Sequence, residues 1–111
     1  MTFKANWEKA HTRITLSKNT LLKMLGTYYN INKDIKTISI IAGGCSNINA
    51  LVHLNNLNNP VILRVYLQDK KSAYKEQKIA SLLQGKLAVP RFHHVAEGFG
   101  YAFAIIEWLP G

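Results

Sequence analysis

Apolar residues recur along the first half of this chain with two different spacings. The helical spacing comes first, after Ser17, whose hydroxyl can cap a helix. Its apolar positions are Leu21, Leu22, Leu25, Tyr28 and Tyr29. The polar segment 30–34 ends this predicted helix, and residues 1–16 show no sustained period, which indicates a tail. Strand-like segments follow at 36–42 and 47–54.

The second half of the chain continues with strands around one more helix. The Asn-rich segment 55–60 predicts a turn, because Asn tolerates positive φ and Pro60 cannot donate to a sheet. It leads into an apolar strand at 61–67. A helix capped by Asp69 or Ser72 then runs to about Gln84. The last two strands, 91–96 and 101–107, form a hairpin around residues 97–100.

These elements predict an α+β fold. Hairpin-length connections favour an antiparallel five-stranded sheet with a helix packed on one face, preceded by an N-terminal helix. We divide the chain into an N-terminal tail and helix, residues 1–36, and one sheet-containing domain, residues 37–111. We find no repeat and no low-complexity linker.

The chain is basic, with 14 Lys and Arg against 6 Asp and Glu and a net charge of +8. This charge makes nucleotide phosphates, nucleic acid and anionic lipid candidate partners. The lysines form no dense tract and few aromatic residues separate them, so we interpret them as solvated faces and expect no nucleic-acid footprint.

Cysteine content and hydropathy indicate the compartment. Cys45 is the single cysteine, so no internal disulfide can form, which favours a reducing environment. The polar start at Met1–Lys4 is unlike a signal peptide, and no apolar run approaches membrane-spanning length. We therefore predict a soluble cytoplasmic protein that does not contact a membrane.

A glycine pair between the first two strands is the first candidate site. Gly43 and Gly44 are followed by the small polar residues Ser46 and Asn47. Such a turn leaves backbone N–H groups free to point at an anion and lets a phosphate approach closely. The pair alone is weak evidence for that chemistry.

Two isolated charges provide the second indication. Arg64 is the only charge in the strand 61–67, and Glu76 falls on the apolar stripe of the following helix. That stripe contains Ala73, Glu76, Ile79, Ala80 and Leu83. Because an unpaired buried guanidinium is costly, we predict an Arg64–Glu76 ion pair. The pair is either a structural salt bridge or a device by which Glu76 positions Arg64 on nucleotide phosphates.

Together with two later segments, these motifs resemble a known family. Residues from about 37 to 111 look like the N-terminal lobe of the aminoglycoside phosphotransferase and choline kinase superfamily, which is distantly similar to protein kinases. The matching segments are Gly43-Gly44-x-Ser46-Asn47, Val61-Ile62-Leu63-Arg64, Glu76 with its leucine-rich helix, Val89-Pro90, and Ile106-Glu107-Trp108-Leu109-Pro110-Gly111.

The resemblance implies a role for each matching residue. Gly43, Gly44, Ser46 and Asn47 would position the nucleotide, Arg64 would bind phosphate, and Glu76 would be the helix partner of Arg64. Backbone groups from Glu107 to Leu109 would form the hinge that hydrogen-bonds adenine. Many members carry Lys at the position of Arg64, and arginine keeps the charge with a different phosphate geometry.

The resemblance also implies the activity of the parent protein. We expect a small-molecule kinase that transfers the γ-phosphate of ATP, with Mg²⁺, to a hydroxyl of an aminoglycoside, choline, ethanolamine, thiamine or related amine. The family's catalytic Asp, in a His-Gly-Asp segment, and its metal-binding Asp belong to a C-terminal lobe that this sequence lacks. We therefore predict no catalytic or metal residue here, and a chain that is inactive alone and self-associates.

Other interpretations remain open from the residues themselves. A non-catalytic basic module that binds nucleic acid would explain the lysines, and a degenerate pseudokinase lobe would serve as a scaffold. His93 and His94 could suggest a metal, but adjacent strand residues point to opposite faces and no other ligand lies at a suitable spacing.

Overall fold

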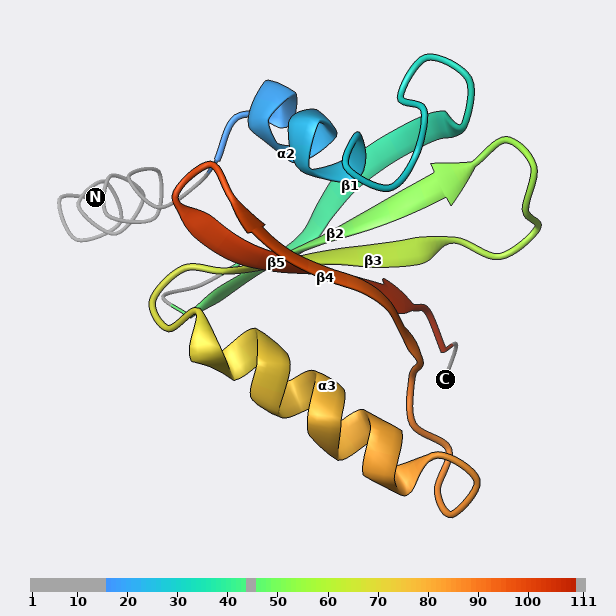
Figure 1. The fold of residues 1–111 in the computed structure, drawn as a ribbon. Helices are drawn as coiled ribbons and strands as arrows, with labels where there is room; N and C mark the ends of the chain where they lie inside the picture. The colour runs from blue at the N-terminus through green and yellow to red at the C-terminus, as the bar shows by residue number, and fades with distance from the viewer. Residues whose placement is uncertain (1–15, 44–45, 110–111) are drawn as a thin grey trace, which may run out of the picture.

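The computed structural model describes residues 16–43 and 46–109. Within these residues, two helices and five strands follow one another in the predicted order (Figure 1). They are α2 (Lys18–Leu25), β1 (Ile35–Gly43), β2 (Asn47–Leu54), β3 (Val61–Tyr66), α3 (Lys71–Leu83), β4 (Phe92–Gly98) and β5 (Tyr101–Glu107). The predicted α+β class is confirmed.

The five strands form one antiparallel sheet in the order β1-β2-β3-β5-β4. The chain therefore places β3 at the centre, with β2 on one side and β5 on the other. A two-residue turn at Phe99 and Gly100 closes the last hairpin, and both residues have positive φ, 58° and 90°. Two successive positive φ values match the twist of the flanking strands, as in type I′ turns.

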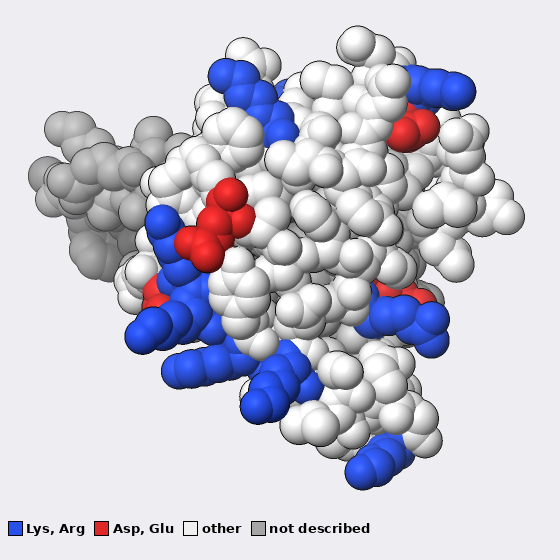
Figure 2. Space-filling model, viewed as in Figure 1, with Lys and Arg blue, Asp and Glu red and all other residues white. Residues whose placement is uncertain are grey.

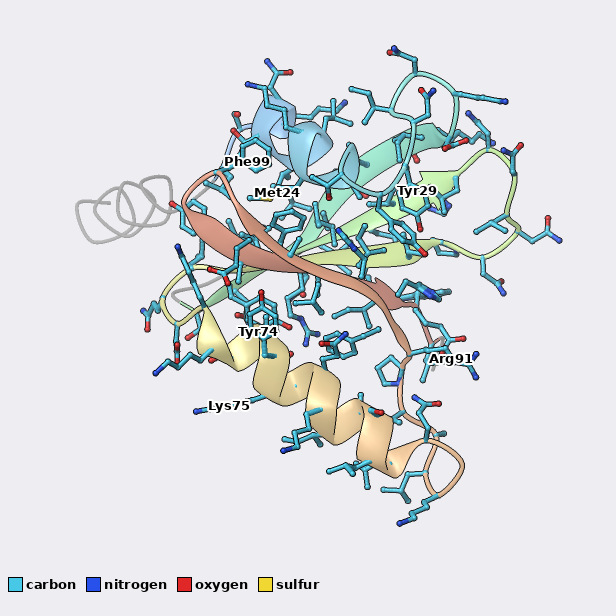
Figure 3. The ribbon with its side chains drawn as sticks, viewed as in Figure 1. Met24, Tyr29, Tyr74, Lys75, Arg91 and Phe99 are labelled. Atoms are coloured by element: carbon cyan, nitrogen blue, oxygen red, sulfur yellow. The ribbon has the colours of Figure 1, made fainter. Side chains whose placement is uncertain are left out.

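One face of the sheet is covered by α2 (Figure 1). Leu21, Met24 and Leu25 of this helix are buried against alternate residues of the strands. In β3 the residues on this face are Val61, Leu63 and Val65, and in β2 they are Ile48, Ala50, Val52 and Leu54. Figure 3 shows Met24 between α2 and the sheet. This face holds the larger of the two apolar cores.

The opposite face is covered in part by α3, which lies below the sheet in Figure 1. The core on this side is smaller, and α3 contributes the small side chains Ala73 and Ala80 to burial. This helix packs mainly against β4 and β5, and its Glu76 reaches Arg64 and Tyr66 of β3. The two helices therefore lie on opposite faces.

Three details of the helices differ from the sequence interpretation. The helix α2 ends at Leu25, before Tyr28 and Tyr29, because Gly26 is the C-cap and the Thr27 hydroxyl donates to the Met24 carbonyl at 2.7 Å. The N-cap of α3 is Lys70; neither Asp69 nor Ser72 occupies that position, although the Asp69 carboxylate accepts from the Lys71 N–H at 2.9 Å.

The third correction concerns Ile79, which we placed on the buried stripe of the second helix. Its side chain is 56% exposed. Successive helix residues are rotated by about 100°, so Ile79 points well away from its buried neighbour Ala80. The stripe that faces the sheet is consequently narrower than the sequence suggests.

Charge is distributed unevenly over the surface. Figure 2 shows Lys and Arg side chains gathered near α3, and Lys70, Lys71, Lys75 and Lys78 are all exposed. Lys75 points away from the sheet (Figure 3). Within residues 16–43 and 46–109, no helix is long and apolar enough to cross a membrane. The same residues contain no cluster of three His, Cys, Asp or Glu suited to a metal ion.

Candidate functional site

Four side chains of β2 and β3 lie in a square on the face that carries α3. The register pairs Asn47 with Tyr66 and Asn49 with Arg64. Because side chains alternate between faces, residues two apart on each strand share a face. The odd-numbered residues of β2 and the even-numbered residues of β3 thus line one surface, while their neighbours enter the core under α2.

The guanidinium of Arg64 is held at two of its nitrogens. Its Nη1 donates to Oε1 of Glu76 at 2.8 Å, which confirms the predicted ion pair. Its Nε donates to Oδ1 of Asn49, also at 2.8 Å. Charge-assisted bonds of this length are the strong ones among protein hydrogen bonds.

The ion pair is more open than the sequence interpretation assumed. The side chains of Arg64 and Glu76 are 31% and 38% exposed. Arg64 is the one residue of β3 that is not buried, and Ile62 and Tyr66 on the same face are buried on either side of it. Water screens such a pair, so its contribution to stability is below that of a fully buried pair. A solvent-accessible guanidinium is, however, able to meet a ligand.

Tyr66 adds a second donor to the same carboxylate oxygen. Its hydroxyl donates to Oε1 of Glu76 at 2.6 Å, and the ring is buried. Burial and the hydrogen bond to Glu76 raise the pKa of the Tyr66 phenol well above its usual range. The hydroxyl is therefore protonated at neutral pH and donates to Glu76 without adding a charge.

Ser46 and the start of β2 lie beside this cluster. Gly43 ends β1 and Asn47 begins β2, while Gly44 and Cys45 lie outside the described residues. The Ser46 carbonyl accepts from the Leu67 N–H at 2.8 Å, which ties the turn to the end of β3. A pocket of about 140 Å³ is lined by Ser46, Asn47, Tyr66, Gln68, Asp69, Ser72 and Glu76.

The structure places Glu107 and Leu109 in a different hollow from this pocket. That hollow, of about 430 Å³, lies between the β2–β3 connection and the residues after β5, and also includes Trp108. The Glu107 N–H already donates to the Arg91 carbonyl at 2.8 Å. Ser46, Asn47 and Glu76 thus share one pocket, with Arg64 joined through Glu76. Glu107, Trp108 and Leu109 form a second group.

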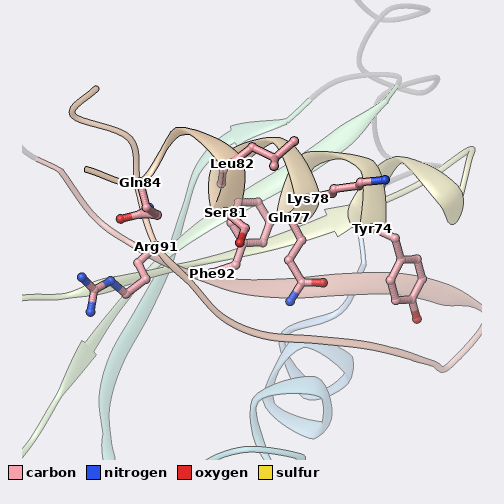
Figure 4. Close-up of a pocket in the computed structure, with 9 residues that line it drawn as sticks. Tyr74, Gln77, Lys78, Ser81, Leu82, Gln84, Arg91 and Phe92 are labelled. Carbon is pink, nitrogen blue, oxygen red and sulfur yellow. The ribbon is translucent and has the colours of Figure 1, made fainter. Parts of the chain in front are cut away.

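A third hollow was not anticipated from the sequence. It measures about 410 Å³ and lies between the C-terminal half of α3 and the start of β4 (Figure 4). Its polar lining includes Gln77, Lys78, Ser81 and Arg91, and none of the residues of the glycine turn contributes to it. The close-up shows Lys78 and Arg91 pointing in different directions. This hollow holds no convergent set of groups.

His93 and His94 do not come together as a pair of metal ligands. The His94 ring stacks on Tyr28 with centroids 5.0 Å apart, and its Nε2 lies 3.2 Å from the Thr27 hydroxyl oxygen. His93 is exposed in a register irregularity of β4. Both placements are those of packing and surface residues.

Sequence reasoning missed Asn49 and Tyr66 as members of the site. The available signal was the polar alternation in β2, where Asn47, Asn49 and His53 fall on one face. That alternation shows that the face is not fully buried. Identifying Asn49 as the partner of Arg64 also requires the register of β2 against β3, which the local pattern does not contain.

Comparison with known proteins identifies one family for this chain. No curated protein and no solved structure gives a significant match to the chain. The sequence model of the phosphotransferase enzyme family matches residues 37–111, which is more than half of the chain and includes the whole site. The chain therefore belongs to the phosphotransferase enzyme family.

Proposed function

We propose that this chain is the ATP-binding lobe of a small-molecule kinase. The observation that carries the proposal is the half-exposed Arg64, fixed by Glu76 and Asn49 beside the pocket of Ser46 and Asn47. A cation held in place at a small polar turn is what phosphoryl transfer requires of a binding lobe, since its catalysis rests on positioning and charge stabilisation.

The residues present fit a nucleoside triphosphate. Arg64 has five N–H groups, and two of them bond to Asn49 and Glu76. The guanidinium also interacts with the Tyr66 hydroxyl, and its remaining N–H groups belong to a side chain that is partly exposed. In the proposal they meet phosphate oxygens, together with Ser46, Asn47 and backbone N–H groups of the turn from Gly43 and Gly44.

The hinge residues supply the other end of the proposed site. Ile62, Leu51 and Ile106 belong to the apolar cluster on the α3 face, where β2, β3 and β5 lie next to one another. A purine ring on this surface would lie toward the backbone of Glu107 to Leu109. The proposal assigns adenine recognition to that segment, as the family resemblance implies.

The proposal places the magnesium site and the site of the phosphate acceptor outside these residues. Bound Mg²⁺ would supply positive charge that neutralises the phosphates, and the proposal assigns its ligands and the catalytic carboxylate to a C-terminal lobe. The proposed reaction is transfer of the γ-phosphate to a hydroxyl of an aminoglycoside, choline, ethanolamine, thiamine or related amine. The residues of this chain bind and orient the donor.

Nucleotide titration of matched variants tests the proposal. Arg64→Ala should weaken ATP binding by roughly 10- to 100-fold, because a charge-assisted contact to phosphate is lost. Lys75→Ala removes the same charge from the exposed side of α3 and should leave ATP affinity unchanged. Isothermal titration calorimetry of the two variants and the unaltered chain provides the comparison.

Equal affinities for Arg64→Ala and Lys75→Ala, or no ATP binding by the unaltered chain, would contradict the proposal. A parallel titration with a single-stranded oligonucleotide separates it from a nucleic-acid module. Binding to nucleic acid falls steeply with salt through counterion release. Tight, salt-sensitive oligonucleotide binding without ATP binding would favour that alternative.

A further inference from the structure

Asn49 is the residue of the site that the family resemblance does not assign. It lies directly across from Arg64 in the β2–β3 ladder, and its Oδ1 accepts from Nε of Arg64 at 2.8 Å. The Nε–H group is only a donor, so the amide oxygen must face it. This bond is the only one between Asn49 and a side chain within residues 16–43 and 46–109.

Two anchors constrain the guanidinium differently from one. The Glu76 bond alone fixes the position of Nη1 but leaves the planar group free to rotate about that contact. The second bond, at Nε, fixes the plane as well. Both Nη2 hydrogens then have set directions, which suits directed hydrogen bonds to phosphate oxygens.

Lysine could not use this second anchor. Its ammonium is a single point with rotatable donors, and it has no group equivalent to Nε. An asparagine acceptor across from this position therefore fixes the plane of an arginine, whereas a lysine has no plane to fix. The observed pairing links the two residue identities through one specific hydrogen bond.

We propose that Asn49 is a positioning residue, which sets the plane of the Arg64 guanidinium and so directs its remaining N–H groups at the phosphate chain of the nucleotide. The inference rests on the proposed function for its ligand, whereas the geometry of the Asn49–Arg64 bond does not. Asn49 acts through Arg64, so its contribution should disappear when residue 64 cannot use it.

A double-mutant cycle with Asn49→Leu and Arg64→Lys tests this dependence. Leucine has a similar size and no acceptor. Asn49→Leu should weaken binding of ATP and of inorganic tripolyphosphate about tenfold when Arg64 is present. In the Arg64→Lys background the same change should alter affinity by less than twofold. Equal losses in both backgrounds would overturn the proposal.

Two further readouts separate positioning from general disruption. Binding of adenosine, which lacks phosphates, should be the same for Asn49→Leu and the unaltered chain, and a matching loss would overturn the proposal. The Arg64 Nε–H resonance in ¹⁵N NMR should be protected from exchange in the unaltered chain and lose protection in Asn49→Leu. If Asn49→Leu fails to fold, Asn49→Ala takes its place in every measurement.

The NMR measurement also distinguishes failure of the positioning role from failure of the proposed function. Absence of ATP and tripolyphosphate binding by the unaltered chain would contradict the proposed function and leave the ligand contact without support. An unprotected Nε–H in a chain that does bind ATP would contradict the positioning role alone.

Discussion

At the scale of single residues, the site depends on one carboxylate oxygen with two donors. Oε1 of Glu76 accepts from Nη1 of Arg64 at 2.8 Å and from the hydroxyl of Tyr66 at 2.6 Å. Tyr66 comes from the strand and Glu76 from α3. The shared oxygen therefore fixes the rotation of the helix relative to β3 as well as the position of the guanidinium.

Tyr66→Phe removes one of these donors and should lower the free energy of unfolding at pH 7 by about 1–2 kcal/mol. It should also change the pH dependence. An unfolded tyrosine ionises near pH 10, whereas burial and the bond to Glu76 raise the pKa of Tyr66 in the folded chain. Above pH 10 the unfolded state binds fewer protons, so stability falls as pH rises.

Urea denaturation from pH 7 to pH 12 measures this effect. The decline above pH 10 should be shallower in Tyr66→Phe than in the unaltered chain. Burial, followed by the electrostatic effects of Tyr28 and Asp34, raises the pKa of Tyr29 to about 12. Tyr29→Phe therefore provides a comparison, in which a different tyrosine of raised pKa is removed. Parallel curves for the unaltered chain and Tyr66→Phe would contradict the role of the Tyr66 hydroxyl.

At the scale of elements, the order of helices and strands could be predicted because apolar periodicity is a local signal. The strand β2 alternates cleanly, and its buried residues Ile48, Ala50, Val52 and Leu54 follow that alternation. The ends of the helices were harder to predict. Tyr28 and Tyr29 continue the helical spacing, yet capping at Gly26 ends α2 before them.

The candidate site was predictable in part for the same reason. Arg64 and Glu76 each stand out as a single charge on an apolar segment, so their pairing followed from the cost of burying a charge. Asn49 and Tyr66 do not stand out in this way. Their roles depend on the β2–β3 register and on the placement of α3, which are long-range properties.

The hairpin of β4 and β5 offers a prediction at this scale. Gly100 has φ of +90°, and a Cβ added there would meet no atom within 4 Å. Gly100→Ala should therefore destabilise the fold by about 1–2 kcal/mol through backbone strain alone. Chemical denaturation measures the change.

Gly98→Ala is the matched control in the same hairpin. A Cβ at Gly98 would make an ordinary 3.8 Å contact with the Phe103 ring, and its φ lies outside the strained region. The expected change is within about 0.5 kcal/mol. A larger loss for Gly98→Ala than for Gly100→Ala would show that the turn does not need the left-handed conformation.

At the scale of the whole molecule, exposed apolar side chains surround the hollow at the end of β5. Leu57, Trp108 and Leu109 are exposed and line that hollow. Clustered apolar surface favours association. We expect the weight-average sedimentation coefficient of the chain to rise with concentration.

Trp108→Ser combined with Leu109→Asn should reduce that rise. Leu82→Ser, which replaces an exposed leucine on α3, should leave it unchanged. A sedimentation coefficient independent of concentration would contradict the prediction, as would an equal effect of Leu82→Ser.

The two-faced packing of β3 has a consequence for how this strand can change over generations. Val61, Leu63 and Val65 fill the core under α2, so replacements there are limited by volume and shape. Arg64 and Tyr66 on the other face are limited by which atoms donate hydrogen bonds. From Leu63 to Tyr66 the strand thus obeys two unrelated rules in alternation, and few of these positions are free to drift.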